Sequence, residues 1–408
     1  MNKKKIINDP VYGFISIPTE LVFDLIEHPY FQRLRYIKQL GMTHLVYPGA
    51  LHTRFHHALG AMHLMGLAIE TLRSKGHAIS YEEEEGVTIA ILLHDIGHGP
   101  FSHALEQTIV EGISHEDISI LIMNKLNQQF NDRLSTAIEI FNGSYKKQFL
   151  HELVSGQLDM DRMDYLNRDS FFTGVSEGVI SFDRIIKMLN VVDDHIAVEE
   201  KGIYSIEKFL IARRLMYWQV YLHKTVIAAE QLLAKILKRS RELAMEGKPL
   251  FATPALNHFL VNRISKQAFM NEDHHIETFA SLDDTDIMSA VKVWADDDDF
   301  VLSRLCRMLM LRNLYQVEIT NDPPGQAVID ELTASALKKY PLSGKDADYF
   351  VFTDTITNNA YKPGDGSIRI LMKDDSIKDI ATASDNSILE ALSQTVKKYI
   401  LCYTKGLV

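Results

Sequence analysis

Cysteine and tryptophan are scarce in this chain, which has 408 residues and only two of each. Two cysteines, Cys306 and Cys402, are too few for a disulfide framework. Both follow apolar patterns typical of helices, so we expect reduced core side chains and no redox chemistry. Long apolar runs are also missing, since no stretch approaches the roughly 20 residues that cross a bilayer, and residues 1–8 lack the apolar core of a signal peptide. These absences predict a cytoplasmic protein without a membrane partner.

A surplus of basic residues is absent as well. The chain has 43 Lys and Arg against 54 Asp and Glu, and its formal net charge is −11. Binding along a nucleic-acid polymer requires a basic surface, so we expect no such partner. A phosphate-bearing small molecule is not excluded, because a few arginines and a metal cation can reverse the local field inside a cleft.

The most informative stretch is the run HDIGHGPFSH at residues 94–103, which follows the apolar residues Ile89–Leu93. Imidazole and carboxylate groups are thereby carried to the end of what reads as a buried helix. If this helix continues through residue 98, His94 and His98 lie on one face. Glycines and a proline then end the helix and allow a ligand to approach the backbone closely. The alternative is a helix end with exposed histidines.

This run, together with QRLRYIKQLG at residues 32–41 and TRFHHALG at residues 53–60, strongly resembles the HD family that removes triphosphate from deoxynucleoside triphosphates (dNTPs). It is particularly similar to the vertebrate members that carry a SAM domain. The resemblance implies hydrolysis at the α-phosphorus, which gives a deoxynucleoside and inorganic triphosphate. Two alternatives stay open: an HD-fold phosphohydrolase that acts on other nucleotides, and a nucleotide-sensing oligomeric protein with little turnover.

The resemblance implies one metal ion, with His57, His94, Asp95 and Asp161 as its ligands. His56 stands where the family usually has an acidic residue, which leaves the choice between His56 and His57 open. Two imidazoles and two carboxylates suit Fe, Mn, Zn, Co or Ni better than Mg, although Mg can accompany the nucleotide. Such an ion would polarise a phosphoryl oxygen and lower the pKa of bound water.

Proton transfer is implied for His115 and Glu116, which match the family's catalytic pair, with His98 beside the site and His103 helping to hold the phosphate charge. In that pair the carboxylate sets the tautomer and basicity of the imidazole. Residues 114–117 also fit a capping box that opens a helix, so a purely structural role is the alternative.

Substrate binding is implied for Gln39, Leu40, Arg54, Arg162, Tyr165, Asp169, Arg213 and Tyr221. In the family, the positions of Gln39 and Leu40 contact the sugar, whereas the arginines would hold phosphate. The alternatives are a solvated face for the acidic stretch 158–169 and an ordinary amphipathic helix for residues 213–221.

A regulatory nucleotide is implied by Asn8, Glu27, Gln32 and Arg35, which match positions that read guanine between subunits of the vertebrate relatives. This resemblance predicts a homo-oligomer, a dimer or a tetramer, in which one dNTP stimulates hydrolysis of another. The alternative is that Gln32 and Arg35 form the exposed side of a short helix.

The order of the expected elements predicts a mostly α protein, an HD-domain helical bundle with a small α+β C-terminal lobe. We expect the metal-dependent core over residues 1–250, a helical extension over 251–345 and the lobe over 346–408. The expected elements include helices at 31–40, 53–74, 206–245 and 388–400, a hairpin near 196–204 and a strand at 368–371.

Overall fold

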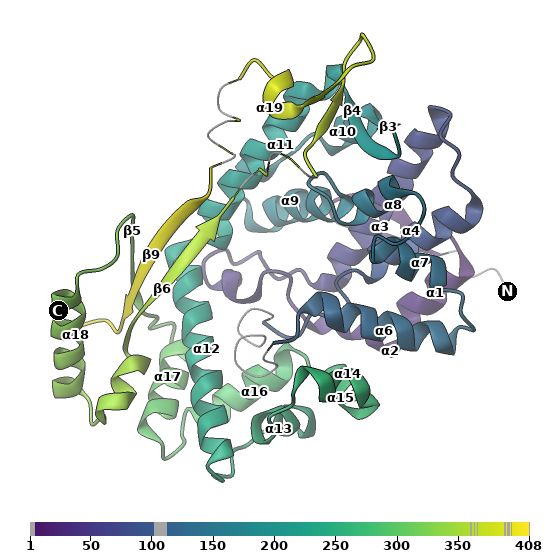
Figure 1. The fold of residues 1–408 in the computed structure, drawn as a ribbon. Coiled ribbons are helices and arrows are strands. Elements are labelled where there is room, and N and C mark those ends of the chain that lie inside the picture. Colours follow the sequence, from purple (N-terminus) through teal and green to yellow (C-terminus); the bar gives the residue numbers. More distant parts are fainter. Residues whose placement is uncertain are drawn as a thin grey trace.

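The protein is described by a computed structural model over residues 5–101, 112–359, 361–362, 364, 366–386, 389, 392 and 394–407 (Figure 1). Helices dominate these residues, and the strands form small sheets, most of them in the second half of the chain. The predicted mostly α fold with a minor β component is therefore confirmed. None of the described helices is long and apolar enough to cross a membrane.

The first half of the chain is a helical core preceded by a hairpin of β1 (Ile6–Asp9) and β2 (Gly13–Ser16). Its helices are α1 (Glu20–Glu27), α2 (Pro29–Gln32), α3 (Arg54–Ser74), α4 (Tyr81–Leu93), α6 (His115–Gln129), α7 (Ser135–Phe141), α8 (Gln148–Val154), α9 (Met160–Thr173) and α10 (Phe182–Met188). Short 3-10 turns at Arg33–Tyr36 and Gly41–Leu45 connect α2 to α3.

Helix α3 lies inside this core and packs against α4 and α9. Every residue of α4 from Val87 to Leu93 is buried, so the end of this helix carries its polar successors into the interior. A Cβ atom at Gly60 of α3 would collide with Asp164 and Arg168 of α9. The missing side chain therefore allows α9 to approach α3 closely.

The second half is arranged along α12, which runs between the helical core and a β-sheet (Figure 1). Its helices are α11 (Ile203–Met216), α12 (Lys224–Met245), α13 (Pro254–Val261), α14 (Lys266–Asn271), α15 (Asp273–Phe279), α16 (Asp284–Trp294), α17 (Phe300–Met310), α18 (Gln326–Lys339) and α19 (Ile380–Ala383). Its strands are β3 (Leu189–Val192), β4 (His195–Glu199), β5 (Gln316–Thr320), β6 (Val351–Asn358), β7 (Arg369–Leu371), β8 (Ile377–Asp379) and β9 (Val396–Tyr403).

Two sheets connect segments that are far apart in the chain. Strand β7 pairs in parallel with β4, which gives the order β3-β4-β7-β8, and β9 pairs antiparallel with both β5 and β6. The C-terminal strands β7 and β8 therefore extend the β3–β4 hairpin, and β6 and β9 form a sheet with β5. The division at residues 250 and 345 stays a prediction.

Several expected elements differ in the structure. The helix expected at 31–40 ends early, because α2 gives way to a 3-10 turn and Ile37 and Gln39 then bond to Arg54 and His52 through their backbones. Helix α4 ends at Leu93, so His94 and His98 do not share the face of a continuing helix.

The long helix expected at 206–245 is interrupted. A π-helical segment at Tyr217–Tyr221 separates α11 from α12, and His223 caps α12 by accepting a hydrogen bond from the backbone N–H of Thr225 at 3.1 Å. The expected terminal helix is wrong for residues 396–400, which belong to β9. Cys402, expected in a helix, also lies in β9; both cysteines are buried and unbridged, as predicted.

Candidate active site

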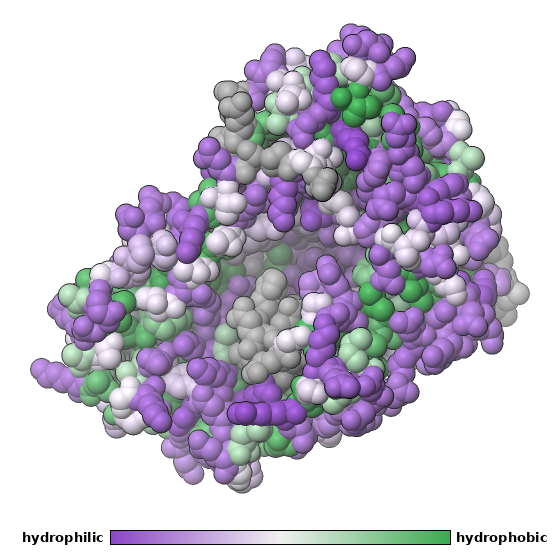
Figure 2. Space-filling model, in the orientation of Figure 1, coloured by the Kyte–Doolittle hydropathy of each residue, from purple (hydrophilic) through white to green (hydrophobic). Residues whose placement is uncertain are grey.

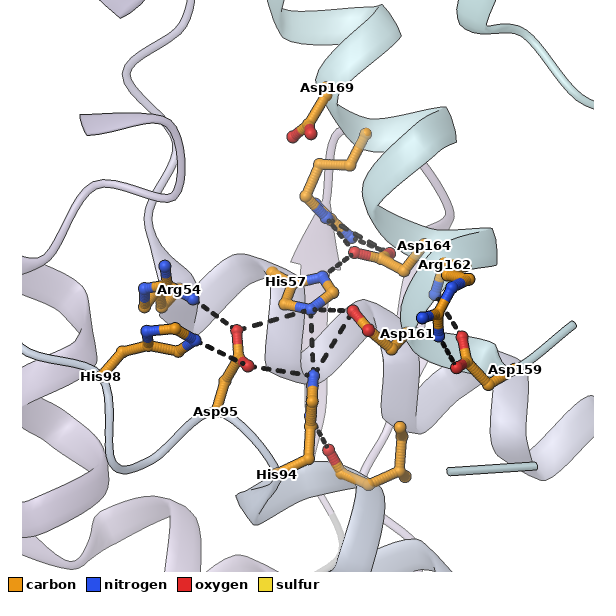
Figure 3. Close-up of polar contacts among 12 residues, drawn as sticks. Arg54, His57, His94, Asp95, His98, Asp159, Asp161, Arg162, Asp164 and Asp169 are labelled. Atoms are coloured by element: carbon orange, nitrogen blue, oxygen red, sulfur yellow. Dashed lines mark hydrogen bonds and ion pairs between the residues drawn. The ribbon is translucent and has the colours of Figure 1, made fainter. Parts of the chain in front are cut away.

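Three helices bring His57, His94, Asp95 and Asp161 together (Figure 3). His57 lies in the first turns of α3, His94 and Asp95 follow α4, and Asp161 lies in the first turn of α9. His57 Nε2 is 3.3 Å from His94 Nε2 and 3.1 Å from Asp161 Oδ1. The carboxylate of Asp95 closes the cluster, with Oδ1 3.4 Å from His94 Nε2 and Oδ2 3.8 Å from His57 Nε2.

The outer nitrogens of both imidazoles are occupied, so that each ring turns Nε2 toward the cluster. His94 Nδ1 lies 2.6 Å from the carbonyl oxygen of Ile91, which can only accept a hydrogen bond. His57 Nδ1 lies 2.7 Å from Asp164 Oδ2, and Arg168 donates to Asp164 at 2.9 Å. Such partners fix the orientation of metal-binding histidines and raise their basicity.

The electrostatics of the cluster fit a cation. Burial opposes protonation of His57, but its hydrogen bonds to Asp161 and Asp164 outweigh burial and raise the pKa of His57 to about 10. Burial likewise opposes protonation of His94, whereas Asp95 and Asp161 raise its pKa. The carboxylates thus create a strongly negative interior, and a divalent ion would satisfy it with both imidazoles neutral. The donor set of two nitrogen and two oxygen ligands suits a transition metal.

His56 is not part of this cluster. Its Nδ1 lies 3.2 Å from the backbone N–H of Thr53, at the start of α3. The structure therefore places His57, and not His56, at the candidate metal site.

His98 and His115 stack beside the cluster, with ring centroids 3.9 Å apart and an angle of 15° between their planes. His98 Nε2 lies 3.3 Å from Asp95 Oδ1, and burial and then the charge of Arg54 hold the pKa of His98 well below its usual value. A Cβ at Gly97 would collide with the backbone of α6, so this glycine permits α6 to present His115 at the site.

A cavity of about 610 Å³ opens onto these groups. Its lining includes His94, Asp95, His115, Glu116, Asp161, Arg162, Tyr165 and Tyr217. Arg162 is paired with Asp159, which caps α9, and this charge raises the pKa of Arg162 further. Proton-transfer, phosphate-binding and metal-binding candidates thus face one cavity. The face of the molecule drawn in Figure 2 is hollowed near its centre, and hydrophilic residues predominate around the hollow.

A second cavity of about 260 Å³ has Gln39, Leu40, Arg54 and Tyr221 in its lining. Tyr217 borders both cavities, so they adjoin at the π-helical segment. Arg54 donates from Nη1 to Asp95 Oδ2 at 2.6 Å and therefore stands between the second cavity and the metal cluster.

Two of the residues expected to bind substrate, Asp169 and Arg213, do not line either of these two cavities. Asp169 is buried and accepts a hydrogen bond from the Tyr221 hydroxyl at 2.7 Å, while its other oxygen lies 2.8 Å from His52 Nε2. It therefore positions Tyr221. Arg213 lies in α11 and is not among the residues that line the two cavities. His103 lies outside the described residues.

The four residues expected to bind a regulatory nucleotide lie near the N-terminus. Asn8 is in β1, Glu27 ends α1, and Gln32 ends α2. Gln32 accepts a hydrogen bond from Arg35 Nε at 2.8 Å, and the guanidinium of Arg35 lies 3.6 Å from the centre of the Phe55 ring. Their role stays a prediction.

Sequence reasoning missed Asp164 and Glu230. Asp164 follows Asp161 by one helical turn, and nothing in the acidic stretch distinguishes the residue that contacts His57. Glu230 faces the 260 Å³ cavity, where burial raises its pKa to about 7. A signal was present for Glu230, since it lies three residues from the buried Ile227 and Leu233 and hence on the buried stripe of α12.

This helical fold, with an adjacent His–Asp pair at the end of a buried helix, is that of an HD-domain protein. Residues 54–169 match the model of the HD domain, and residues 180–249 match that of the HD associated region. An uncharacterized protein of Bacillus subtilis, YwfO, is 33% identical over 96% of this chain and 90% of its own length. The crystal structure of a phosphohydrolase from Bacteroides thetaiotaomicron is 55% identical, covers 98% of this chain and 100% of its own, and superposes with a TM-score of 0.95. This chain belongs to the HD-domain phosphohydrolase family, and it is a hydrolase by fold.

Relatives with a named substrate match a smaller part of the chain. The deoxynucleoside triphosphate triphosphohydrolase SAMHD1 homolog of Dictyostelium discoideum is 34% identical over 56% of this chain, and this chain covers 48% of that protein. The human SAMHD1 enzyme is 31% identical over 54% of this chain, which covers 42% of its length.

Proposed function

We propose that this protein is a metal-dependent dNTP triphosphohydrolase, which converts a dNTP to a deoxynucleoside and inorganic triphosphate. The observation that carries the proposal is the pair of adjoining cavities. One combines the metal cluster with Arg162 and His115, and the other has Gln39 and Leu40 in its lining. A phosphate chain and a nucleoside each have a compartment of suitable chemistry, joined at Tyr217. The names of the SAMHD1 relatives support the same substrate class.

The metal ligands are His57, His94, Asp95 and Asp161, and the ion is a divalent transition metal such as Fe, Mn, Zn, Co or Ni. When bound, it supplies Lewis-acid polarisation of a phosphoryl oxygen and a lowered pKa for water. Asp164 and the Ile91 carbonyl orient the two imidazoles so that their Nε2 atoms serve as ligands.

The remaining residues bind and orient the substrate. Arg54, which lines the smaller cavity and bonds to Asp95, meets the phosphate from that side, and Arg162 meets it from the larger cavity. Arginine presents a planar fork of donors that matches phosphate oxygens. Arg213 and His103 have the same role on the strength of the resemblance alone. Tyr165 and Tyr221 enclose the sugar, and Asp169 holds the Tyr221 hydroxyl in place.

His115 transfers the proton to the leaving 5′-oxygen. The His115 ring stacks on the ring of His98, whose pKa is lowered by burial and by the charge of Arg54. The Glu116 carboxylate lines the same cavity as His115. The stacked pair gives the imidazole of His115 a fixed orientation at the first residue of α6, as general acid catalysis requires.

Product analysis tests the substrate and the bond that is cleaved. The protein loaded with Mn²⁺, Co²⁺, Zn²⁺, Ni²⁺ or Fe²⁺ is incubated with each dNTP and NTP, with and without Mg²⁺, and the products are separated by anion-exchange chromatography. Deoxynucleoside and triphosphate are expected in equal amounts. Release of pyrophosphate or phosphate would instead identify a different phosphohydrolase, and nucleotide binding without any product would identify a sensor.

The proposal extends to assembly and regulation. Asn8, Glu27, Gln32 and Arg35 form a nucleotide site in a homo-oligomer, and the link of Arg35 to Gln32 holds two of these polar side chains together. Addition of dGTP should stimulate hydrolysis of dTTP at subsaturating concentration and increase the sedimentation coefficient. Arg35→Ala should remove the stimulation without changing the products. Identical rates with every added nucleotide would contradict a regulatory role.

A further inference from the structure

We propose that His258, His274 and His275 form a second divalent-metal site, separate from the cluster around His57. His258 lies in α13, and the other two begin α15. Each of the three imidazoles offers a nitrogen atom, and these three nitrogens all lie within 4.8 Å of one another. Apart from the cluster at His57, no other group of potential metal ligands in the described part of the chain meets this criterion.

The spacing of the nitrogens suits a common ion. His258 Nε2 lies 3.0 Å from His275 Nδ1, close to the 3.3 Å that separates the paired nitrogens of His57 and His94. Two nitrogen ligands at about 2.0–2.1 Å from one ion lie roughly 2.8–3.0 Å apart in octahedral geometry and roughly 3.3–3.4 Å apart in tetrahedral geometry. The alternative interpretation is that His258 and His275 only form a hydrogen bond with each other. That interpretation assigns no role to His274.

The third ring approaches the first two from another direction. His274 lies with its ring centroid 5.7 Å from that of His258, at 81° between the planes, and 3.9 Å from that of His275, at 45°. Three imidazoles that meet at different inclinations can surround one point, as the ligands of a facial site do. The His274 side chain is 56% exposed, so solvent can supply a further ligand.

Glu272 lies on the outer side of the two adjacent imidazoles. Its Oε2 atom is 3.5 Å from His275 Nε2 and 3.7 Å from His274 Nδ1. A carboxylate on the outer nitrogen favours the tautomer that carries its proton there and leaves His275 Nδ1 available to a metal. Asp164 occupies the corresponding place behind His57 in the candidate active site.

All three proposed ligand atoms are imidazole nitrogens. Neutral imidazoles without a carboxylate among the three select borderline or soft ions, so the site should take Zn²⁺, Ni²⁺, Co²⁺ or Cu²⁺ in preference to Mg²⁺ or Mn²⁺.

An ion at this site would tie α13 to α15, and α15 packs against α6. Lys125 of α6 contacts Glu277 at 2.9 Å and Asp273 at 3.3 Å, both in α15. In addition, Lys266 of α14 contacts Asp117 of α6 at 2.6 Å. The site would therefore stabilise the segment that supports α6, the helix whose first residue is His115.

Zinc stoichiometry distinguishes the two sites. The chain should bind two Zn²⁺ per molecule, measured by equilibrium dialysis and elemental analysis, and the double variant His57→Ala/His94→Ala should bind one. Adding His274→Ala to that double variant should weaken the remaining site at least tenfold. Because His274 is exposed, its replacement is expected to leave the fold intact, which circular dichroism checks.

Two controls complete the experiment. His195→Ala, which removes a partly exposed histidine paired with Glu152, should leave the zinc affinity of the double variant unchanged. Zinc should raise the Tm of the double variant and have a much smaller effect once His274 is also replaced. A folded double variant that binds no zinc at micromolar concentration, or one whose zinc affinity is unaltered by His274→Ala, would overturn the second site. Neither outcome bears on the proposed substrate, because product analysis does not involve these residues.

Discussion

His57 Nδ1 and Asp164 Oδ2 are joined by a hydrogen bond of 2.7 Å between two fully buried side chains. Asp164 is in turn held by Arg168, and Arg168 Nη1 lies 2.7 Å from Asp9 Oδ2. A chain of alternating charges thus runs from the N-terminal hairpin through α9 to the candidate metal ligand. It links the orientation of His57 to the packing of β1 against the core.

Asp164→Asn should weaken metal binding while leaving the four proposed ligands in place. The amide can still accept a hydrogen bond from His57, but it lacks the negative charge that makes the imidazole a better ligand. Loss of such a partner typically costs about 10- to 100-fold in metal affinity. Titration of the metal-free protein with Co²⁺ or Zn²⁺ measures the effect. Asp183→Asn, at an exposed position of α10, is the matched control, and an equal affinity in the two folded variants would contradict the prediction.

Asp95→Ala should abolish activity and metal binding at the His57 cluster together. Asp95 contributes one of the two proposed carboxylate ligands and also accepts the hydrogen bond of 2.6 Å from Arg54. Its removal leaves Arg54 without that partner, so a loss of stability is expected as well. Metal content and turnover are measured on the same folded preparation, with His274→Ala added so that only the first site is counted. Full occupancy of the first site in that protein would eliminate Asp95 as a ligand.

His115→Ala should keep the fold and the metal but lose most of the turnover, because general acid or base catalysis typically contributes about 10²- to 10⁴-fold. The adjacent Ser114→Ala is the control, since Ser114 accepts a hydrogen bond from the backbone of Asp117 at 3.1 Å and caps α6. Loss of the cap should cost about 0.5–2 kcal/mol of stability with little effect on kcat. Urea unfolding and steady-state kinetics separate the two. The reverse pattern would make His115 a structural residue.

Local signals in the sequence predicted the parts of the fold that depend on a few neighbouring residues. A capping box opens α4, where the Ser80 hydroxyl accepts a hydrogen bond from the Glu83 backbone at 3.1 Å and the Ser80 backbone N–H donates to the Glu83 carboxylate at 2.8 Å. The capping box expected at residues 114–117 is confirmed, with Ser114 and Asp117 bonded reciprocally at the start of α6. Helix α3 also begins and ends where the periodicity predicts, because its caps and apolar spacing are contained within the helix itself.

Sequence patterns did not predict the features that depend on tertiary contacts. Residues 213–221 have helical spacing, but the backbone widens into a π-helical segment at Tyr217–Tyr221, where Tyr217 borders both cavities. The helix expected at 388–400 is wrong at its C-terminal end, because residues 396–400 belong to β9. In the structure β9 lies between β5 and β6, where hydrogen bonding to two neighbours determines its conformation.

In the candidate site, too, residues in local motifs were predictable from the sequence, whereas partners brought in by tertiary packing were not. The run at residues 94–103 and the histidine at 57 were recognisable because consecutive residues carry the pattern. The partners that orient them were not, since Asp164, Arg168 and Asp9 meet only through the packing of α3, α9 and β1. Asp169 contacts His52 and Tyr221, partners that the sequence did not indicate, and its expected contact with substrate stays a prediction.

Glu230 should make the free energy of unfolding depend on pH. Its carboxyl group lines the 260 Å³ cavity together with Lys38, Arg54, Tyr217 and Tyr221. Both cations have carboxylate partners elsewhere, Lys38 with Asp284 at 3.2 Å and Arg54 with Asp95 at 2.6 Å. Burial is the cause that raises the pKa of Glu230 from 4.5 to about 7. The folded protein therefore holds this proton more tightly than the unfolded chain does.

The sign of the effect follows from linkage. Below pH 4.5 the carboxyl group of Glu230 is protonated in both the folded and the unfolded state, so its titration does not lower the free energy of unfolding. As the pH rises toward 7, the unfolded chain releases the proton first, and the free energy of unfolding therefore falls. The loss is complete above pH 7 and amounts to at most about 3 kcal/mol, less where water in the cavity solvates the charge.

Glu230→Gln removes this titration without changing the shape of the side chain. The variant should match the parent in urea unfolding at pH 4.5 and exceed its stability at pH 8, whereas Glu70→Gln, on the exposed face of α3, should follow the parent at both. Parallel stability curves for Glu230→Gln and the parent between pH 4.5 and 8 would mean that the carboxylate is solvated or paired in solution.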